Sequence, residues 1–241
     1  MVKMKKLSIV IPCYNEEEGL KNLSEQLDPV ITKLREEFLV ELILVNDGST
    51  DNTLKKMAEF FIDKAKIISY CKNRNLGGAL KEGFKHITGD IIITMDSDCT
   101  YSPKEIIPLL SSLDEKTDVV TASPYHPKGK VENVPKYRLL LSRTISLIYG
   151  MILGEKLYTY TAMFRAYKRE VIDNVKIKNN GFIGVTELLL FSILKGYKVK
   201  EFPTTLHSRM YGISKIKLLK TIKEHIILIL DLIKLKGTKK K

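Results

Sequence analysis

The chain has 241 residues, of which 28% are charged and 44% belong to the hydrophobic set. This length and composition suffice for one large α/β core or two small ones, which excludes a disordered tail and a small disulfide-stapled domain. Three cysteines, Cys13, Cys71 and Cys99, have neither the pairing of a disulfide framework nor the spacing of zinc ligands, so we expect a reducing, cytoplasmic compartment.

The formal charge of +12 is concentrated near the C-terminus. Residues 195–241 carry 13 basic and 3 acidic side chains, a net charge of +10, so only +2 remains for residues 1–194. The basic residues of this segment are almost all lysines, and few aromatic residues lie among them, which argues against nucleic acid as a partner. A membrane surface fits this distribution better.

Residues 7–122 alternate short β-branched runs with longer amphipathic stretches. This alternation predicts an α/β fold with a mostly parallel sheet flanked by helices. The expected strands cover residues 7–11, 41–45, 66–69, 91–95 and 118–121, and the expected helices cover residues 17–37, 50–62, 76–87 and 103–114. Ligands of such sheets bind at the carboxyl ends of the strands, so a site is expected there.

The alternation stops after Pro124. The next expected elements are a helix over residues 136–152, a strand over 158–167, a helix over 185–195 and an extended segment over 197–206. These elements are too few to bury a core of their own. We therefore expect one domain over residues 1–210, in which residues 123–210 complete the part formed by residues 1–122.

Residues 211–241 are expected to form a C-terminal basic amphipathic helix and a lysine tail. The helical spacing of apolar side chains covers residues 215–235, and it involves Ile216, Leu219, Ile222, Ile226, Ile229, Leu230 and Ile233. Two interpretations stay open, because this face can pack on the domain or lie in a membrane interface. The longest apolar run, residues 226–230, falls far short of the ~20 residues that cross a bilayer. The expected location is therefore peripheral, on the cytoplasmic face of a membrane.

Two strand ends carry carboxylates. Residues 44–51 are an apolar strand that runs into Asp47 and a turn at Gly48, where a carboxylate can accept hydrogen bonds from a base or a ribose. Asp96 and Asp98 follow a second apolar run, and their spacing of two aims both the same way, so they repel each other unless they are paired. A divalent cation that holds a diphosphate relieves this repulsion, since Mg²⁺ or Mn²⁺ accepts one or two carboxylates together with phosphate oxygens. A solvated acidic turn is the plainer alternative.

Four short motifs of the first half occur in a characteristic order. They are Pro12-Cys13-Tyr14-Asn15-Glu16, Asn46-Asp47-Gly48-Ser49-Thr50-Asp51, Asn75-Leu76-Gly77 with Gly83, and Asp96-Ser97-Asp98. In this order and spacing they resemble the family 2 glycosyltransferases of the GT-A fold. The resemblance implies that residues 1–122 are a nucleotide-sugar-binding half and residues 123–210 an acceptor half.

The second half is similar to the dolichyl-phosphate mannose synthase branch of that family. The matching residues are Arg138, Ser142, Arg143, Phe164, Arg165, Gly181, Phe182, Glu187, Pro203, Arg209, Gly212, Ser214 and Lys215. The resemblance implies transfer of a sugar from a nucleotide sugar to a polyprenyl phosphate. It also implies site roles: Pro12, Tyr14, Glu16 and Asp47 hold the nucleoside, Asp96 and Asp98 hold the metal diphosphate, and Arg138, Ser142, Arg209 and Lys215 grip phosphates.

Three places depart from the branch pattern. Thr100 stands where a metal-binding glutamine is usual, Pro124 stands where an arginine is usual, and residues 159–165 read Thr-Tyr-Thr-Ala-Met-Phe-Arg. These departures leave the sugar and the acceptor open.

The acceptor determines which catalytic group is needed. A sugar hydroxyl needs a general base, for which Glu187 is the candidate, whereas a lipid phosphate is already ionised and needs cations that orient it. Arg138, Arg143, Arg165, Arg209 and Lys215 supply such cations and favour the phosphate, although Arg165 is also a candidate for a structural salt bridge with Glu187. Transfer to a hydroxyl of a lipid-linked or surface glycan remains the second hypothesis, and a membrane-docking protein without catalysis is the third.

Overall fold

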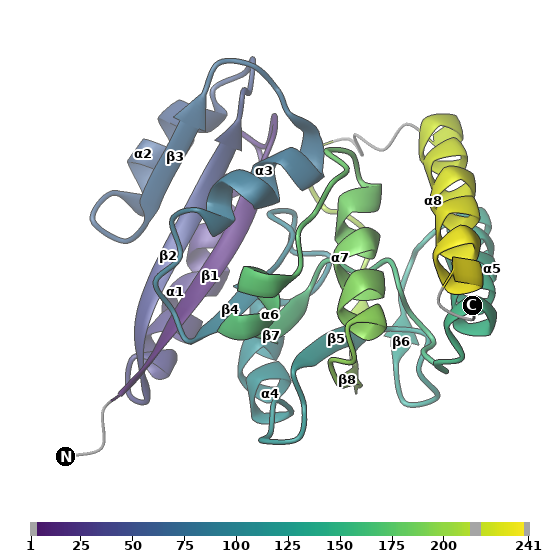
Figure 1. Ribbon diagram of the computed structural model, residues 1–241. Helices are drawn as coiled ribbons and strands as arrows, with labels where there is room; N and C mark the ends of the chain where they lie inside the picture. Colours follow the sequence, from purple (N-terminus) through teal and green to yellow (C-terminus); the bar gives the residue numbers. More distant parts are fainter. Residues whose placement is uncertain (1–3, 213–217, 239–241) are drawn as a thin grey trace.

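The computed structural model of the chain describes residues 4–212 and 218–238. Its main sheet has seven strands in the order β3-β2-β1-β4-β7-β5-β8 (Figure 1). The strands are β1 (Lys5–Cys13), β2 (Phe38–Asp47), β3 (Lys66–Tyr70), β4 (Ile91–Thr94), β5 (Val119–Ser123), β7 (Arg165–Lys168) and β8 (Val199–Pro203). Only β7 runs antiparallel to its neighbours, β4 and β5, so the prediction of a mostly parallel sheet is confirmed.

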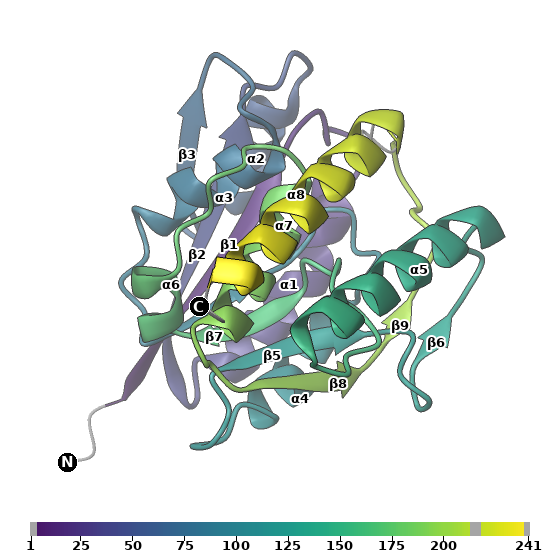
Figure 2. The same ribbon diagram turned by 45° about the vertical axis from the view of Figure 1, so that its right-hand side comes forward.

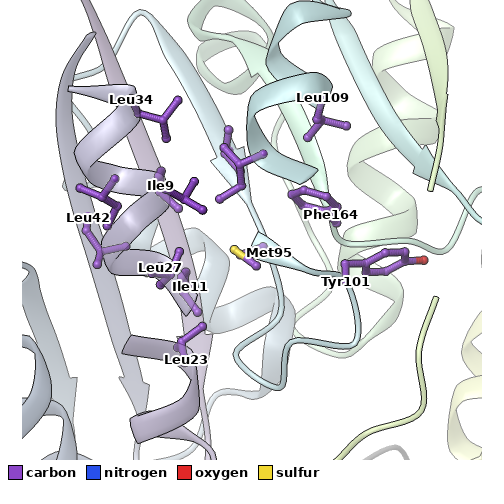
Figure 3. Packing of buried hydrophobic residues seen from close by; sticks show 14 of the residues in the cluster. Ile9, Ile11, Leu23, Leu27, Leu34, Leu42, Met95, Tyr101, Leu109 and Phe164 are labelled. Carbon is purple, nitrogen blue, oxygen red and sulfur yellow. The ribbon is translucent and has the colours of Figure 1, made fainter. Parts of the chain in front are cut away.

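Helices cover both faces of the sheet (Figures 1 and 2). One face carries α1 (Leu20–Leu34), α2 (Thr53–Phe61), the 3-10 turn η1 (Pro103–Glu105) and α4 (Ile106–Ser111), and the other carries α3 (Asn75–Phe84), α6 (Arg169–Asn174) and α7 (Ile183–Leu194). Figure 3 shows the first layer, in which Leu23, Leu27 and Leu34 of α1 pack against Ile9 and Ile11 of β1. Their spacing of four and seven places them on one side of the helix, which is the pattern that predicted it.

The strand predicted over residues 158–167 is wrong for most of its length, because only Arg165–Lys168 forms β7. At residues 158–160 the backbone N–H groups bond to side chains instead of to a neighbouring strand. The N–H groups of Tyr158 and Thr159 donate to Glu201 Oε1, and the N–H group of Tyr160 donates to Ser146 Oγ. Two short strands, β6 (Lys130–Val131) and β9 (Thr205–Leu206), pair parallel to each other beside the main sheet.

Helices α5 (Lys136–Leu153) and α8 (Leu218–Thr238) lie side by side at one end of the molecule (Figures 1 and 2). Leu228 and Leu232 of α8 are buried against the domain, and His225 Nδ1 lies 2.8 Å from the Tyr149 hydroxyl of α5. Large apolar side chains nevertheless remain exposed on both helices. On α5 they are Tyr137, Leu140, Leu141, Leu147 and Met151, and on α8 they are Leu218, Leu219, Ile226, Ile227, Leu230, Ile233 and Leu235.

The face of α8 that the sequence pattern singled out is therefore mostly exposed, and Leu219 is 84% exposed. Helix α8 packs mainly through Leu228 and Leu232, which lie outside that face, together with Ile229, which belongs to it. Among the residues that the structure describes, no helix has the length and apolar character needed to span a membrane.

Candidate active site

The carboxyl ends of β2, β1 and β4 meet at one edge of the sheet. These three strands are adjacent and parallel, and their register pairs Cys13 with Asn46, so the loops that follow them converge. They enclose a cavity of about 260 Å³, called here the strand-end pocket. Its lining consists of Pro12, Cys13, Tyr14, Glu16, Asp47, Asn73, Asn75, Leu76, Ala79, Asp96, Ser97, Asp98, Met163, Phe182 and Arg209. Six residues that the sequence had assigned to nucleoside or metal binding thus lie in one pocket.

Asp47 lies at the end of β2 and is 2% exposed. Its Oδ1 accepts hydrogen bonds from the Tyr70 hydroxyl and the Arg74 N–H, both at 2.7 Å, and its Oδ2 accepts one from Asn73 Nδ2 at 2.9 Å. Burial raises the pKa of Asp47, and the hydrogen bonds from Arg74 and Tyr70 oppose the shift because they stabilise the charged form. The carboxylate is therefore held in one orientation at the wall of the pocket.

The loop after β1 is held by the loop after β2. The backbone N–H of Asn15, a residue with a positive φ of 53°, donates to Ser49 Oγ at 3.0 Å. The backbone N–H of Glu16 donates to Thr53 Oγ1 at 2.7 Å. These contacts place Tyr14 and Glu16 at the pocket.

Asp96 and Asp98 follow β4 and line the strand-end pocket. Burial, together with the neighbouring charges of Asp98 and Glu16, raises the pKa of Asp96 well above its ordinary value. Thr100 donates from its N–H and its hydroxyl to Asp98 Oδ1, at 3.1 and 2.9 Å, so this residue orients Asp98. Within residues 4–212 and 218–238, no group of three His, Cys, Asp or Glu side chains is arranged to hold a metal. The two aspartates fit a cation whose coordination is completed by phosphate oxygens and water.

Arg209 reaches the same carboxylates from the loop after β9. Its Nη2 contacts Glu16 Oε2, and its Nη1 lies 3.8 Å from Asp98 Oδ2. This arginine opposes the rise in the pKa of Asp96 that its carboxylate neighbours cause. The loop is fixed at both ends, since the His207 N–H donates to the Thr100 carbonyl and the Gly212 N–H donates to Glu18.

A second cavity, of about 690 Å³, adjoins the strand-end pocket and is called here the apolar groove. Helices α5, α7 and α8 form its walls, with side chains such as Leu141, Ile145, Ile222 and Ile229. The two cavities share the six residues Leu76, Asp96, Asp98, Met163, Phe182 and Arg209. This shared boundary is where a group bound in one cavity would meet a group bound in the other.

Arg138 and Ser142, which the resemblance implied to grip phosphates, line the apolar groove. Ser142 Oγ lies 2.8 Å from Thr161 Oγ1, and Arg138 is exposed. Arg143 is also exposed, and its guanidinium lies 5.0 Å from the centre of the Tyr125 ring. Lys215 lies outside the described residues.

Glu187 is not brought to either cavity, in contrast to its expected place as a base. It is 5% exposed, and its Oε2 accepts the backbone N–H groups of Lys178 and Asn179 at 2.9 and 2.8 Å. Arg165 does not form the expected salt bridge with Glu187 either. It is fully buried and donates to Thr121 and Tyr167 and to the carbonyls of Tyr160 and Val185. Both residues thus hold the fold together behind the cavities.

Several residues at or beside the pocket had no site role in the sequence analysis. Tyr70 and Asn73 orient Asp47, and Leu76 and Phe182, which belong to the matched motifs, form with Met163 the apolar part of the shared boundary. Tyr70 could have been predicted from the parallel pairing of β2 and β3, because the register places it beside Asp47. No comparable signal marks Met163, because it lies in the irregular segment before β7.

The fold and this site define a GT-A architecture, with a polar pocket at the strand ends and a groove beside it. The profile described as "Glycosyl transferase family 2" matches residues 8–176, and the chain belongs to that family.

Individual relatives agree with this assignment. The chain is 34% identical over 236 residues to a dolichol-phosphate mannosyltransferase of Pyrococcus furiosus, an alignment that covers 96% of this chain and 65% of the relative. The chain thus spans slightly less than two thirds of that relative's length. The fold of this chain is similar to that of glucosyl-3-phosphoglycerate synthase from Mycobacterium tuberculosis, solved with Mn²⁺, UDP and phosphoglyceric acid. The two structures superpose with a TM-score of 0.70 at 19% sequence identity, and the match covers 94% of this chain and 77% of the other. A structure of the same synthase with Mg²⁺ and UDP gives a TM-score of 0.69 at 19% identity, covering 94% and 78% of the two chains.

Proposed function

We propose that this protein is an inverting, metal-dependent glycosyltransferase that moves a sugar from a nucleotide sugar to a polyprenyl phosphate. The observation that carries the proposal is the boundary shared by the two cavities, where Asp96, Asp98 and Arg209 face both. A small polar pocket suits a nucleotide, and a long apolar groove suits a lipid chain. The similarity to a dolichol-phosphate mannosyltransferase supports the same pairing of a sugar donor with a lipid-phosphate acceptor.

In this proposal the strand-end pocket binds the donor. Pro12, Tyr14, Glu16 and Asp47 hold the nucleoside, and the fixed orientation of Asp47 suits hydrogen bonds from a base or ribose. Asp96 and Asp98 hold Mg²⁺ or Mn²⁺ against the diphosphate. When bound, the metal neutralises the charge that develops on the leaving diphosphate.

The acceptor phosphate is placed where the apolar groove meets the pocket. Arg209 already lies at this boundary, and Arg138 and Ser142 line the groove beside it. We propose that these groups, with Lys215, orient the phosphate for in-line attack on the anomeric carbon. A phosphate monoester has a second pKa of about 6, so it is ionised without a base.

Transfer to a sugar hydroxyl is less well supported, because that reaction needs a carboxylate placed as a base. Glu187, the candidate for that role, is occupied by two backbone N–H groups and lines neither cavity. The acidic groups at the shared boundary are the aspartates proposed for the metal.

The test is a donor screen with purified protein, Mn²⁺ and a short polyprenyl phosphate. Release of nucleoside diphosphate together with a sugar-bearing lipid supports the proposal and identifies the donor. Release only when a glycan replaces the lipid phosphate would support the second hypothesis. If no nucleotide sugar gave any release of nucleoside diphosphate, both transferase hypotheses would be contradicted, and the membrane-docking protein without catalysis would remain.

We also propose that the exposed apolar faces of α5 and α8 lie on a membrane surface. Both helices border the apolar groove, so a membrane at this end would bring a lipid acceptor to it. Helix α5 carries Lys136, Arg138 and Arg143 and no acidic residue, which suits anionic headgroups. We expect vesicle flotation to depend on anionic lipid and to weaken in the double variant Leu140→Ser, Leu147→Ser. Unchanged flotation of that variant would contradict a docking role for α5.

A further inference from the structure

The turn at residues 178–182, which leads into α7, is clamped by hydrogen bonds from two sides. From α7, Glu187 Oε2 accepts the N–H groups of Lys178 and Asn179. Inside the turn, Asn179 Oδ1 accepts the Gly181 N–H at 2.7 Å. The Glu187 carboxylate oxygen holds the backbone of the turn firmly, because hydrogen bonds to a charged acceptor, here at 2.8 and 2.9 Å, are the strongest in proteins.

The first turn of α3 forms the second side of the clamp. The N–H groups of Gly77 and Gly78 donate to the carbonyls of Gly181 and Asn180, both at 3.1 Å. The contact is so close that a Cβ on Gly77 would lie 2.4 Å from the Asn179 carbonyl oxygen. Glycine is thus required at position 77, and α3 and α7 approach each other through this turn.

The clamp fixes two side chains at the shared boundary of the cavities. Leu76 precedes the donors of α3, and Phe182 directly follows the clamped turn. Both line the strand-end pocket and the apolar groove, as does Met163. Together these three side chains are the apolar part of a boundary whose polar part is Asp96, Asp98 and Arg209.

We propose that Glu187 is a positioning residue that holds Phe182 and Leu76 as a water-excluding wall at the point of transfer; this inference rests on the proposed function. In transfer, an acceptor oxygen bonds to the anomeric carbon, and the bond from that carbon to the diphosphate oxygen breaks. If water reaches the same carbon, its oxygen forms the bond instead, its proton passes to solvent, and free sugar and nucleoside diphosphate result. The wall suppresses this second reaction by keeping water out.

The test compares Glu187→Gln with Glu187→Met and measures two products, nucleoside diphosphate and glycosylated acceptor. The oxygen of glutamine accepts both N–H groups, so Glu187→Gln keeps the wild-type ratio of the two products. Methionine fills the same space but offers no strong hydrogen-bond acceptor to the two N–H groups. We therefore expect Glu187→Met to release about tenfold more nucleoside diphosphate per glycosylated acceptor, because small displacements at a reacting centre slow transfer about 10- to 100-fold. Glu41→Ala is the matched control, because Glu41 also accepts a backbone N–H, from Thr88, toward the other end of the sheet. We expect it to lower thermal stability and leave the product ratio unchanged.

A second readout does not need turnover. The chain has no tryptophan, so Phe182→Trp introduces a single tryptophan at the wall. We expect the same emission maximum with glutamate or glutamine at position 187, and a red shift with methionine, because the freed turn exposes the indole to water.

The outcomes separate the inference from the proposed function. A wild-type protein that processes no donor contradicts the proposed function, while the fluorescence still tests the clamp. The inference is overturned if Glu187→Met keeps the wild-type ratio of nucleoside diphosphate to glycosylated acceptor. It is also overturned if methionine at position 187 leaves the tryptophan emission maximum unshifted. A loss of transfer in Glu187→Gln equal to that in Glu187→Met also overturns it, because only a base would require the ionisable oxygen.

Discussion

Arg209 and Glu16, 193 positions apart in the sequence, form an ion pair at the strand-end pocket, and the same guanidinium lies 3.8 Å from Asp98. Three carboxylates therefore share one arginine, since Asp96 lies beside Asp98 and its pKa responds to the charges of both Glu16 and Arg209. A bound cation would meet the same carboxylates. The arginine and the metal are expected to compete for them.

This competition gives the first prediction. Arg209→Gln removes a positive charge from the carboxylates, so Mn²⁺ without nucleotide should bind several-fold more tightly, while transfer falls about 100-fold because the phosphates lose their cation. Titration calorimetry with Mn²⁺ and a transfer assay measure the two effects. Arg169→Gln is the control, since that arginine pairs with Asp173 within α6 and lines neither cavity. Equal Mn²⁺ affinity of Arg209→Gln and the wild type would contradict the competition.

The second prediction concerns Thr100, which donates twice to Asp98. Thr100→Val keeps the shape of the side chain but loses the hydroxyl donor, so we expect metal affinity to weaken about 10-fold, the low end of the effect of groups that orient ligands. Asp98→Asn should weaken it much further. Mn²⁺ binding followed by electron paramagnetic resonance checks both variants. If Thr100→Val bound Mn²⁺ as the wild type does, Thr100 would not orient a ligand.

The third prediction concerns Tyr70, whose hydroxyl donates to Asp47 at 2.7 Å. Burial and the neighbouring carboxylate raise the pKa of Tyr70, so the hydroxyl stays a donor over the working range of pH. Tyr70→Phe should weaken nucleoside diphosphate binding about 10-fold, because a hydrogen bond to a charged group contributes about 1.5 to 3 kcal/mol. Tyr197→Phe, which loses a hydroxyl beside Asn174 of α6, provides the control and should bind nucleotide normally.

The fourth prediction is a pH dependence of stability from His225. Burial lowers the pKa of this histidine from 6.5 to about 4, so the imidazole is neutral in the folded protein. The unfolded chain takes up a proton as the pH falls through 6.5 and the folded protein does not, so stability is lost between pH 6.5 and about pH 4. The difference in Tm between the wild type and His225→Gln should shrink over this range. Parallel Tm curves for the two proteins would contradict the assignment.

The sequence predicted the parts of the fold that depend on local pattern. The five strands expected over residues 7–121 are all present as β1 to β5, because short apolar runs that end in turn residues are typical of such strands. Most of these strands are largely buried, and β3 lies at the edge of the sheet and is partly exposed. The convergence of Asp47 and Asp96 followed from the same rule, since parallel strands end at one edge.

The remaining features depend on contacts between distant residues. Residues 158–164 have the composition of a strand, but the N–H groups of residues 158–160 donate to the side chains of Glu201 and Ser146. Glu187 is a carboxylate and could serve as a general base by residue type alone. Only the position of the 178–182 turn shows that one of its oxygens already accepts two backbone hydrogen bonds. The exposed stripe of α8 could not be told from its packed stripe, because both are apolar.

Strand β7 also constrains the order in which the molecule is made. It is inserted between β4 and β5, so the strand that carries Asp96 to its place has an unpaired edge until residues 165–168 have been synthesised. A nascent chain or a truncated fragment that stops at residue 122 would expose this apolar edge and leave β5 without its antiparallel partner. The pocket at the strand ends is therefore completed late in translation, and shortened expression fragments of its first half are expected to aggregate.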